Sequence, residues 1–167
     1  ANSSFITGKS AMRLMGSWFA NQVYTDDTAT IDPSNIVAVK IPMISGKGNA
    51  TDYCGGFIES FWVNKEVKHP AEAADFAIFM NEKMGQASYE TGAGFSGWTG
   101  DFDESNLNPL FIQIKELLSE GETGVLAWDT SLDGEPATIH NEQVQTLFAA
   151  GADTDLFIEE HEAAINK

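Results

Sequence analysis

The sequence predicts a mixed α/β fold with few strands and about four to five helices. Segments of roughly alternating apolar and polar residues, typical of half-buried strands, fall within the first 64 residues, and apolar stripes at helical spacing follow from residue 70 onward. Hydrophobic residues make up 43% and charged residues 20% of the 167-residue chain, a composition typical of a globular protein rather than a disordered one.

Three segments of the first half are predicted as strands because they carry β-branched or long apolar residues and end at glycine, proline or a polar turn. They are residues 11–16 (AMRLMG), 36–44 (IVAVKIPMI) and 57–64 (FIESFWVN). Residues 17–24 are predicted as a short helix capped by Ser17, and the polar residues 25–35 as a loop. Residues 45–56 form a glycine-rich connection.

Helices are predicted over most of the second half. The clearest begins at Pro70, with Glu72 in its first turn, and runs to about Tyr89. Its apolar stripe consists of Ala73, Phe76, Ala77, Met80 and Met84. The other three predicted helices run from Asn108-Pro109 to near Gly121, from about Asn141 to Ala150 before Gly151, and from about Thr154 to Ile165.

The charge balance limits the partners of the chain. It carries 25 acidic residues against 9 Lys and Arg, a formal net charge of -16, which repels phosphate backbones and anionic lipid and so argues against nucleic-acid binding. Cys54 is the only cysteine, which excludes an intrachain disulfide and a zinc site built on thiolates.

No residue pattern in the sequence points to catalysis, a metal or a cofactor. His69, His140 and His161 are scattered and are interpreted as surface or capping histidines. Residues 129–140 resemble a calcium loop, but its twelfth position is His140 instead of a bidentate Glu. The acidic residues at 101–104 are interpreted as a solvated turn. A hydrolase built on two carboxylates stays open without specific support.

The four tryptophans are the distinctive candidates for binding. Trp18, Trp62, Trp98 and Trp128 lie near predicted strand ends or in glycine-rich or polar segments, and Trp98 lies in a long glycine-rich loop, residues 91–106. An aromatic face suits the apolar C–H face of a sugar ring, while nearby polar groups take its hydroxyls. Partial burial in the core is the alternative for each, and it is strongest for Trp62 in its alternating segment.

Five stretches follow one another in an order that is typical of one family. They are FITGKSAMRLMGSWFANQV (5–23), IVAVKIPMI (36–44), CGGFIESFWVNKEVKHPAEAADFAIFMNEKMGQASYE (54–90), TGAGFSGWTG (91–100), and VLAWDTSLDG with VQTLFAAGADTDLFIEEHEAAINK (125–134 and 144–167). Together they resemble bacterial extracellular solute-binding proteins, family 1, of the sugar ABC-transporter type. The resemblance covers nearly the whole chain, which looks like the C-terminal part of the longer family members.

The resemblance implies a partial periplasmic-binding-protein-like (type II) fold, taken from a protein of two α/β lobes joined by crossing strands. Residues from about 1–30 and 92–167 would belong to the second lobe and residues from about 36–91 to the first. Neither lobe would hold a complete sheet. Because exposed strand edges invite pairing, we expect this chain either to pair with a second copy as a homodimer, by exchanging elements, or to rearrange.

The resemblance also implies a site. Gly16 and Trp18 occupy the Gly-x-Trp positions whose tryptophan lines the ligand cleft and stacks on a sugar ring. Further ligand-binding positions implied by the family pattern are Gly55, Gly56, Glu59, Trp98 and Trp128. The match is looser at Trp128 and loosest at Trp98, where this sequence has GFSGW in place of a segment with proline, and Glu59 replaces a small residue.

The function implied by the resemblance is non-catalytic capture of an extracellular oligosaccharide and its delivery to the membrane permease of an ABC transporter. The protein would be extracellular, lipid-anchored at the cell surface or periplasmic, with its signal upstream of this chain. A carbohydrate-active enzyme or a polysaccharide-binding module that uses the same tryptophans is the alternative, and a purely structural or protein-binding domain is a third.

Overall fold

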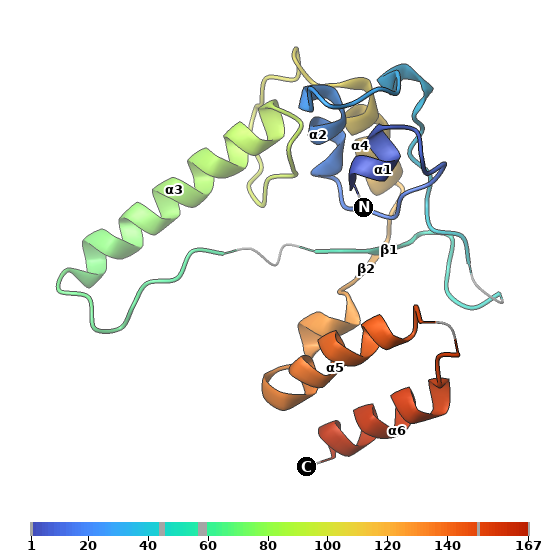
Figure 1. The fold of residues 1–167 in the computed structure, drawn as a ribbon. Coiled ribbons are helices and arrows are strands. Elements are labelled where there is room, and N and C mark those ends of the chain that lie inside the picture. Colours follow the sequence, from blue (N-terminus) through green and yellow to red (C-terminus); the bar gives the residue numbers. More distant parts are fainter. Residues whose placement is uncertain (1, 44–45, 57–59, 150, 167) are drawn as a thin grey trace. The chain divides into compact units, whose positions relative to one another are not determined.

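The computed structural model describes residues 2–43, 46–56, 60–149 and 151–166, without the side chains of residues 128 and 129 (Figure 1). Over these residues the elements are, in order, α1 (Asn2–Ile6), α2 (Phe19–Thr25), a 3₁₀ turn (Pro33–Asn35), β1 (Asp52–Cys54), α3 (Pro70–Glu90), α4 (Pro109–Ser119), β2 (Thr123–Val125), a second 3₁₀ turn (Trp128–Ser131), α5 (Gly134–Thr146) and α6 (Thr154–Ile165). The chain divides into two compact units, residues 1–124 and 125–167.

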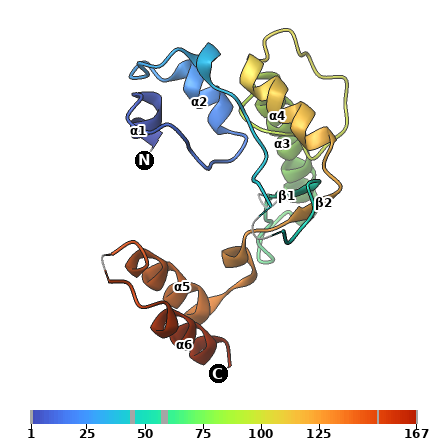
Figure 2. The same cartoon turned by 90° about the vertical axis from the view of Figure 1, so that its right-hand side faces the viewer.

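The predicted mixed α/β class is confirmed. The described residues are mostly helical, and β1 and β2 form a small parallel two-stranded sheet (Figure 2). The specific periplasmic-binding-protein-like architecture stays a prediction. None of the described helices combines the length and the apolar character that crossing a membrane requires.

The core of the first unit lies where α1, α2 and α4 meet. Its buried residues are Ile6, Phe19, Ala20, Val23, Leu107, Leu110 and Phe111. The Phe5 and Phe19 rings are 5.8 Å apart, and Phe95 stacks on the fully buried Phe111 at 4.7 Å. The contact between Phe95 and Phe111 connects the loop after α3 to the core, because Phe95 belongs to that loop.

Helix α3 has the predicted start at Pro70 and ends one residue beyond the predicted Tyr89. None of its residues is buried, and Phe76 of the predicted apolar stripe is 63% exposed. Figure 1 shows α3 running out from the group that α1, α2 and α4 form. Only its C-terminal turn reaches the core, where the Tyr89 ring meets Phe111 edge-on at 5.7 Å.

The three predicted strands are wrong as far as the structure describes them. Residues 11–16, 36–43 and 60–64 contain no strand, and residues 44 and 57–59 lie outside the described residues. The two strands instead occupy Asp52–Cys54, within the predicted connection, and Thr123–Val125. A strand needs a partner for its backbone groups, so an alternating segment without a neighbouring strand stays irregular.

Three helix predictions need correction. Trp18, not Ser17, is the N-cap residue of α2, and no side chain caps that end. The short helix α1 was not predicted. Helix α5 begins at Gly134 and ends at Thr146, earlier than the predicted range, because Pro136 is tolerated in a first helical turn.

Helices α4 and α6 follow their predictions, because each has a strong N-cap. The Asn108 carboxamide oxygen accepts the Phe111 N–H at 2.7 Å. The Asp153 carboxylate accepts the N–H groups of Asp155 and Leu156, each at 3.0 Å. Such side chains satisfy backbone donors that the first helical turn leaves unpaired.

In the second unit, α5 packs beside α6, and their interface contains a histidine pair. His140 Nδ1 and His161 Nε2 are 3.0 Å apart, and His161 Nδ1 lies 2.9 Å from the Phe157 carbonyl oxygen. His161 is buried, so its interpretation as a surface or capping residue is wrong. His69 is exposed at the N-cap position of α3, without a side-chain cap.

Candidate functional site

The loop that follows α3 folds against the C-terminal half of that helix and forms two adjacent cavities that are open to solvent. The larger has a volume of about 430 Å³ and is lined by Tyr89, Phe95, Ser96, Trp98, Thr99, Gly100, Asp101, Phe102 and Glu104. The smaller, about 240 Å³, is lined by Glu82, Gln86, Trp98, Thr99, Gly100, Asp101 and Phe102. We call this pair of cavities the Trp98 site. Trp98 belongs to both.

The Trp98 indole is held at one edge and open elsewhere. Its Nε1–H donates to Asn81 Oδ1 of α3 at 2.5 Å, and its backbone N–H donates to Ser96 Oγ at 3.0 Å. A Cβ at Gly85 would lie 2.7 Å from Ser96 Oγ and 3.6 Å from Trp98 Cδ1, so glycine permits the close approach of this loop to α3. Trp98 is 44% exposed, which leaves ring surface for a ligand.

A wall of aromatic rings connects the Trp98 site to the core. Tyr89 lies 4.9 Å from Phe102 and 6.4 Å from Phe95, measured between ring centroids. Phe95 in turn stacks on the buried Phe111. Because packing holds these rings, the apolar side of the site is preformed rather than assembled by a ligand.

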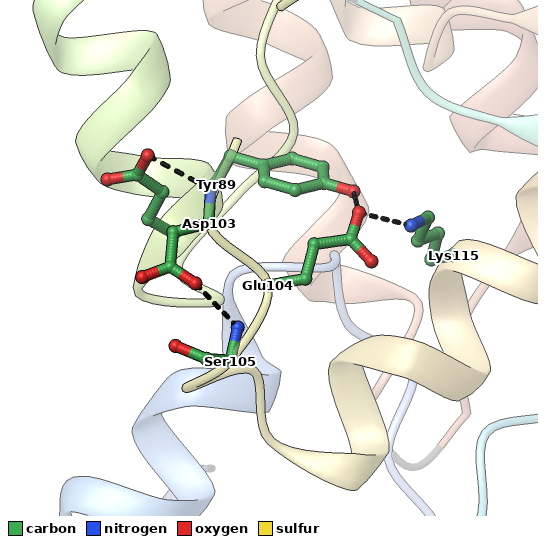
Figure 3. A network of polar contacts seen from close by, with 6 residues as sticks. Tyr89, Asp103, Glu104, Ser105 and Lys115 are labelled. Atoms are coloured by element: carbon green, nitrogen blue, oxygen red, sulfur yellow. Dashed lines mark hydrogen bonds and ion pairs between the residues drawn. The ribbon is translucent and has the colours of Figure 1, made fainter. Parts of the chain in front are cut away.

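The polar side of the site is organised around Glu104, as Figure 3 shows. Its Oε1 accepts the Tyr89 hydroxyl at 2.6 Å and the Lys115 ammonium at 2.5 Å. The hydrogen bond from Lys115, followed by that from Tyr89, lowers the pKa of Glu104, and the same carboxylate raises the pKa of Lys115. Glu104 is therefore an ionised acceptor at neutral pH, held in place by two donors.

A second set of hydrogen bonds shapes the backbone of the loop. Glu90 Oε1 accepts Gln86 Nε2 at 3.0 Å and the Asp103 N–H at 3.2 Å. The Asp103 carboxylate accepts the Ser105 N–H at 2.9 Å, and hydrogen bonding from Ser105 lowers the pKa of Asp103 (Figure 3). The turn at residues 101–104 is therefore a structured edge of the site, more than the solvated turn inferred from sequence.

Gly16 and Trp18 form a separate arrangement in the same unit. A Cβ at Gly16 would overlap the Cζ3 and Cη2 atoms of the Trp18 ring, so only glycine lets the ring lie where it does. Trp18 is 59% exposed. The Gly-x-Trp spacing therefore has a local steric reason, and it presents a largely open indole. Neither residue lines the Trp98 site.

Of the remaining residues of the predicted site, Gly55 and Gly56 do not line the Trp98 site. Gly55 and Gly56 directly follow β1, and Gly55 has a φ of +143° with open space around it. Glu59 lies outside the described residues. Trp128 begins the 3₁₀ turn of the second unit, and its side chain is not among those that the structure describes. Trp62, the tryptophan for which burial was expected most, is 90% exposed.

The sequence did not predict several residues that line the Trp98 site or support it. Tyr89, Phe95 and Phe102 line it, and Glu104 was interpreted only as part of a solvated turn. Asn81 and Lys115 support it by hydrogen bonds to Trp98 and Glu104. The density of aromatic and acidic residues in GFSGWTGDFDE was an available signal. Asn81 and Lys115 gave none, because their roles depend on which helix faces the loop. Among the described residues, no group of three or more His, Cys, Asp and Glu is arranged to hold a metal ion.

Comparisons with protein-family models, with curated proteins and with solved structures find no match to this chain.

Proposed function

We propose that this chain binds a carbohydrate without cleaving it and that Trp98 is the principal stacking platform. The observation that carries the proposal is the Trp98 site itself, in which an indole anchored by Asn81 lies beside a packed aromatic wall and a fixed carboxylate. Ring faces suit the C–H faces of a sugar, and the Ser96, Thr99, Asp101 and Glu104 side chains can bond its hydroxyls.

The biological setting of the proposal comes from the resemblance to family 1 solute-binding proteins. We propose that the ligand is an extracellular oligosaccharide, that the longer protein delivers it to an ABC-transporter permease, and that it acts outside the cell, lipid-anchored or periplasmic. Lobe closure around the ligand would signal occupancy to the permease. Trp18, open and supported by Gly16, would be a second platform.

The chemistry of Glu104 favours binding over hydrolysis within this proposal. A glycosidase needs one carboxylic acid with a raised pKa to protonate the leaving group. The Lys115 and Tyr89 hydrogen bonds instead lower the pKa of Glu104. We therefore assign Glu104 the role of hydrogen-bond acceptor for sugar hydroxyls, and the carbohydrate-active enzyme is the less favoured alternative.

Calorimetric titration with a panel of neutral oligosaccharides tests the proposal. We expect saturable binding that Trp98→Ala weakens by about 1–2 kcal/mol, roughly five- to thirtyfold in Kd, because one stacking face is lost. Trp62→Ala is the matched control, because Trp62 is exposed and lines neither cavity. We expect it to leave Kd unchanged.

Three outcomes would contradict the proposal. Equal losses of affinity in the Trp98→Ala and Trp62→Ala variants would mean that Trp98 is no special platform. Release of shorter products from the bound oligosaccharide, detected by chromatography, would replace capture with hydrolysis. Absence of binding by folded protein to every member of the panel would remove the carbohydrate from the proposal.

A further inference from the structure

The charges that line the Trp98 site are all negative. Glu82, Asp101 and Glu104 are among its lining residues, and no Lys, Arg or His is. Lys115 bonds Glu104, and Lys83 lies 3.8 Å from Glu82. Asp101 lines both cavities and takes part in none of the ion pairs found among the described residues. The site therefore has one carboxylate more than it has neighbouring cations.

Aromatic faces beside an unneutralised carboxylate are a combination that recognises ammonium groups. The indole of Trp is the strongest cation–π partner among the side chains, and Trp98 shares both cavities with Asp101. The net charge of -16 makes the surrounding potential negative, which attracts a cationic ligand and repels uronates, sialic acids and sugar phosphates.

We propose that the saccharide bound at the Trp98 site carries free ammonium groups, as an oligosaccharide of unacetylated amino sugars does. This inference rests on the proposed carbohydrate-binding function and specifies its ligand class. The sugar face lies against the aromatic side of the site, and the ammonium is attracted by the Trp98 ring and by Asp101. A neutral sugar keeps the stacking contact and loses both charge interactions.

Three oligosaccharides of equal length, with the same backbone and linkage, isolate the ammonium. They differ only at the second ring carbon, which carries a hydroxyl in the cellulose series, an ammonium in the chitosan series and an acetamido group in the chitin series. Titrations use an acidic buffer in which the amino sugar is protonated, and they are repeated at high ionic strength. At low salt we expect the chitosan oligomer to bind about five- to tenfold tighter than the cellulose oligomer.

A substitution at Asp101 then tests the source of the preference. Asp101→Asn keeps the shape and removes the charge, so the ratio of the cellulose-series Kd to the chitosan-series Kd should fall toward one. Asp75→Asn, on an exposed residue of α3 outside both cavities, makes the same change in net charge and should preserve the ratio. High salt should lower the ratio in the unsubstituted protein.

The outcomes separate this inference from the function on which it rests. Equal binding of all three oligomers would overturn the ammonium preference and leave carbohydrate binding unaffected. The same conclusion would follow if Asp75→Asn lowered the ratio of the cellulose-series Kd to the chitosan-series Kd as much as Asp101→Asn does. Failure of all three to bind would overturn both. Tetramethylammonium chloride is the fourth probe. If tetramethylammonium, which has no sugar ring, bound as tightly as the chitosan oligomer, the site would recognise a cation without a sugar. That result would overturn the proposal that the ligand is a saccharide.

Discussion

At the scale of single residues, two glycines decide where tryptophan rings lie. Gly16 leaves the space that the Trp18 ring occupies, and Gly85 lets the loop that carries Trp98 approach α3. A Cβ at Gly16 would overlap the Trp18 ring, and a Cβ at Gly85 would lie too close to Ser96 Oγ, which bonds the Trp98 N–H. The accessible indole surfaces therefore depend on residues that have no side chain.

Gly16→Ala is expected to displace the Trp18 ring, because the new methyl group would overlap two ring atoms. The measurement is the indole N–H spectrum by NMR, where the Trp18 signal should move far more than the signal of Trp98. Gly94→Ala is the control, because a Cβ there meets only Ser88 Cβ, at 4.0 Å. An unmoved Trp18 signal in the Gly16 variant would contradict the close approach.

The Glu104 carboxylate makes part of the stability depend on pH. Its pKa is lowered in the folded chain, so the stabilisation is complete above the ordinary Glu pKa of 4.5 and is lost as the pH falls through the lower folded value. The contribution of Lys115 to stability depends on pH in the opposite direction. Its pKa is raised, so its contribution is present at neutral pH and is lost as the pH rises through the folded value.

Glu104→Gln is therefore expected to lower the free energy of unfolding at neutral pH, with a difference from the unsubstituted protein that shrinks as the pH falls below 4.5. Urea unfolding over a series of pH values measures this difference. Glu66→Gln is the control, because Glu66 has only a loose and exposed ion pair with Lys65 at 3.7 Å. A pH-independent loss in the Glu104 variant would mean that packing, not charge, is responsible.

At the scale of elements, local signals predicted a helix start well where the first residues carry a strong signal. Pro70 is the first residue of α3, and the Asn108 and Asp153 side chains cap α4 and α6. Helix α5 begins with Gly134 and has no side-chain cap, and its start was placed several residues too late. Caps act within one turn, which is why sequence alone reveals them.

Asn108→Ala is expected to cost about 1 kcal/mol of stability, because it leaves the Phe111 N–H without its acceptor at the start of α4. Chemical denaturation measures the loss. In Asn108→Asp a carboxylate oxygen can accept the same N–H, so this variant should retain most of the stability that Asn108→Ala loses. If both variants lose equally, the cap is not the reason for the effect.

The histidine pair should couple α5 to α6. His161 Nδ1–H donates to the Phe157 carbonyl, which leaves His161 Nε2 to accept from His140 Nδ1–H. A double-mutant cycle with His140→Ala and His161→Ala is expected to give a coupling of about 0.5–1.5 kcal/mol. Hydrogen exchange of the α6 amides in the full chain measures it. Additive effects would show that the rings do not interact.

At the scale of the whole molecule, much apolar surface is left open. Residues 36–43 are the clearest case. Ile36 and Ala38 pack on the core and Lys40 pairs with Glu120 at 2.9 Å, while the alternate residues face outward. The outward residues are Val37, Val39, Ile41 and Met43, all exposed. A row of exposed apolar side chains of this kind favours pairing with another chain.

We propose that a second copy covers this segment, in an antiparallel register with Val39 opposite Val39. That register places Val37 opposite Ile41 and keeps the two Lys40 ammonium groups apart. Val39→Lys should weaken self-association about tenfold, measured by sedimentation velocity. Phe148→Lys, at an exposed residue of the second unit, is the control and should have no effect.

Salt distinguishes a second copy from a basic partner. Two chains of formal charge -16 repel, so added salt should strengthen self-association, whereas it would weaken the binding of a cationic protein. A chain that stays monomeric at every salt and protein concentration would contradict the homodimer.

The sequence by itself determined the ranges of α3, α4 and α6 and the candidacy of Trp98 and Trp18, and it predicted the mixed α/β class from segments that are not the strands. These follow from caps, from helical spacing and from glycine next to aromatic residues, all of which act over a few neighbouring positions. They need no knowledge of what lies across the fold.

Only the tertiary structure decided the strands and the Trp98 site. Residues 36–43 alternate like a strand, yet none of the described residues pairs with them as a strand, whereas residues 52–54 pair with residues 123–125. Similarly, Asn81 and Lys115 act on Trp98 and Glu104 because α3 and α4 bring them there. Pairing and convergence are long-range contacts, and local spacing in the sequence does not encode the partner.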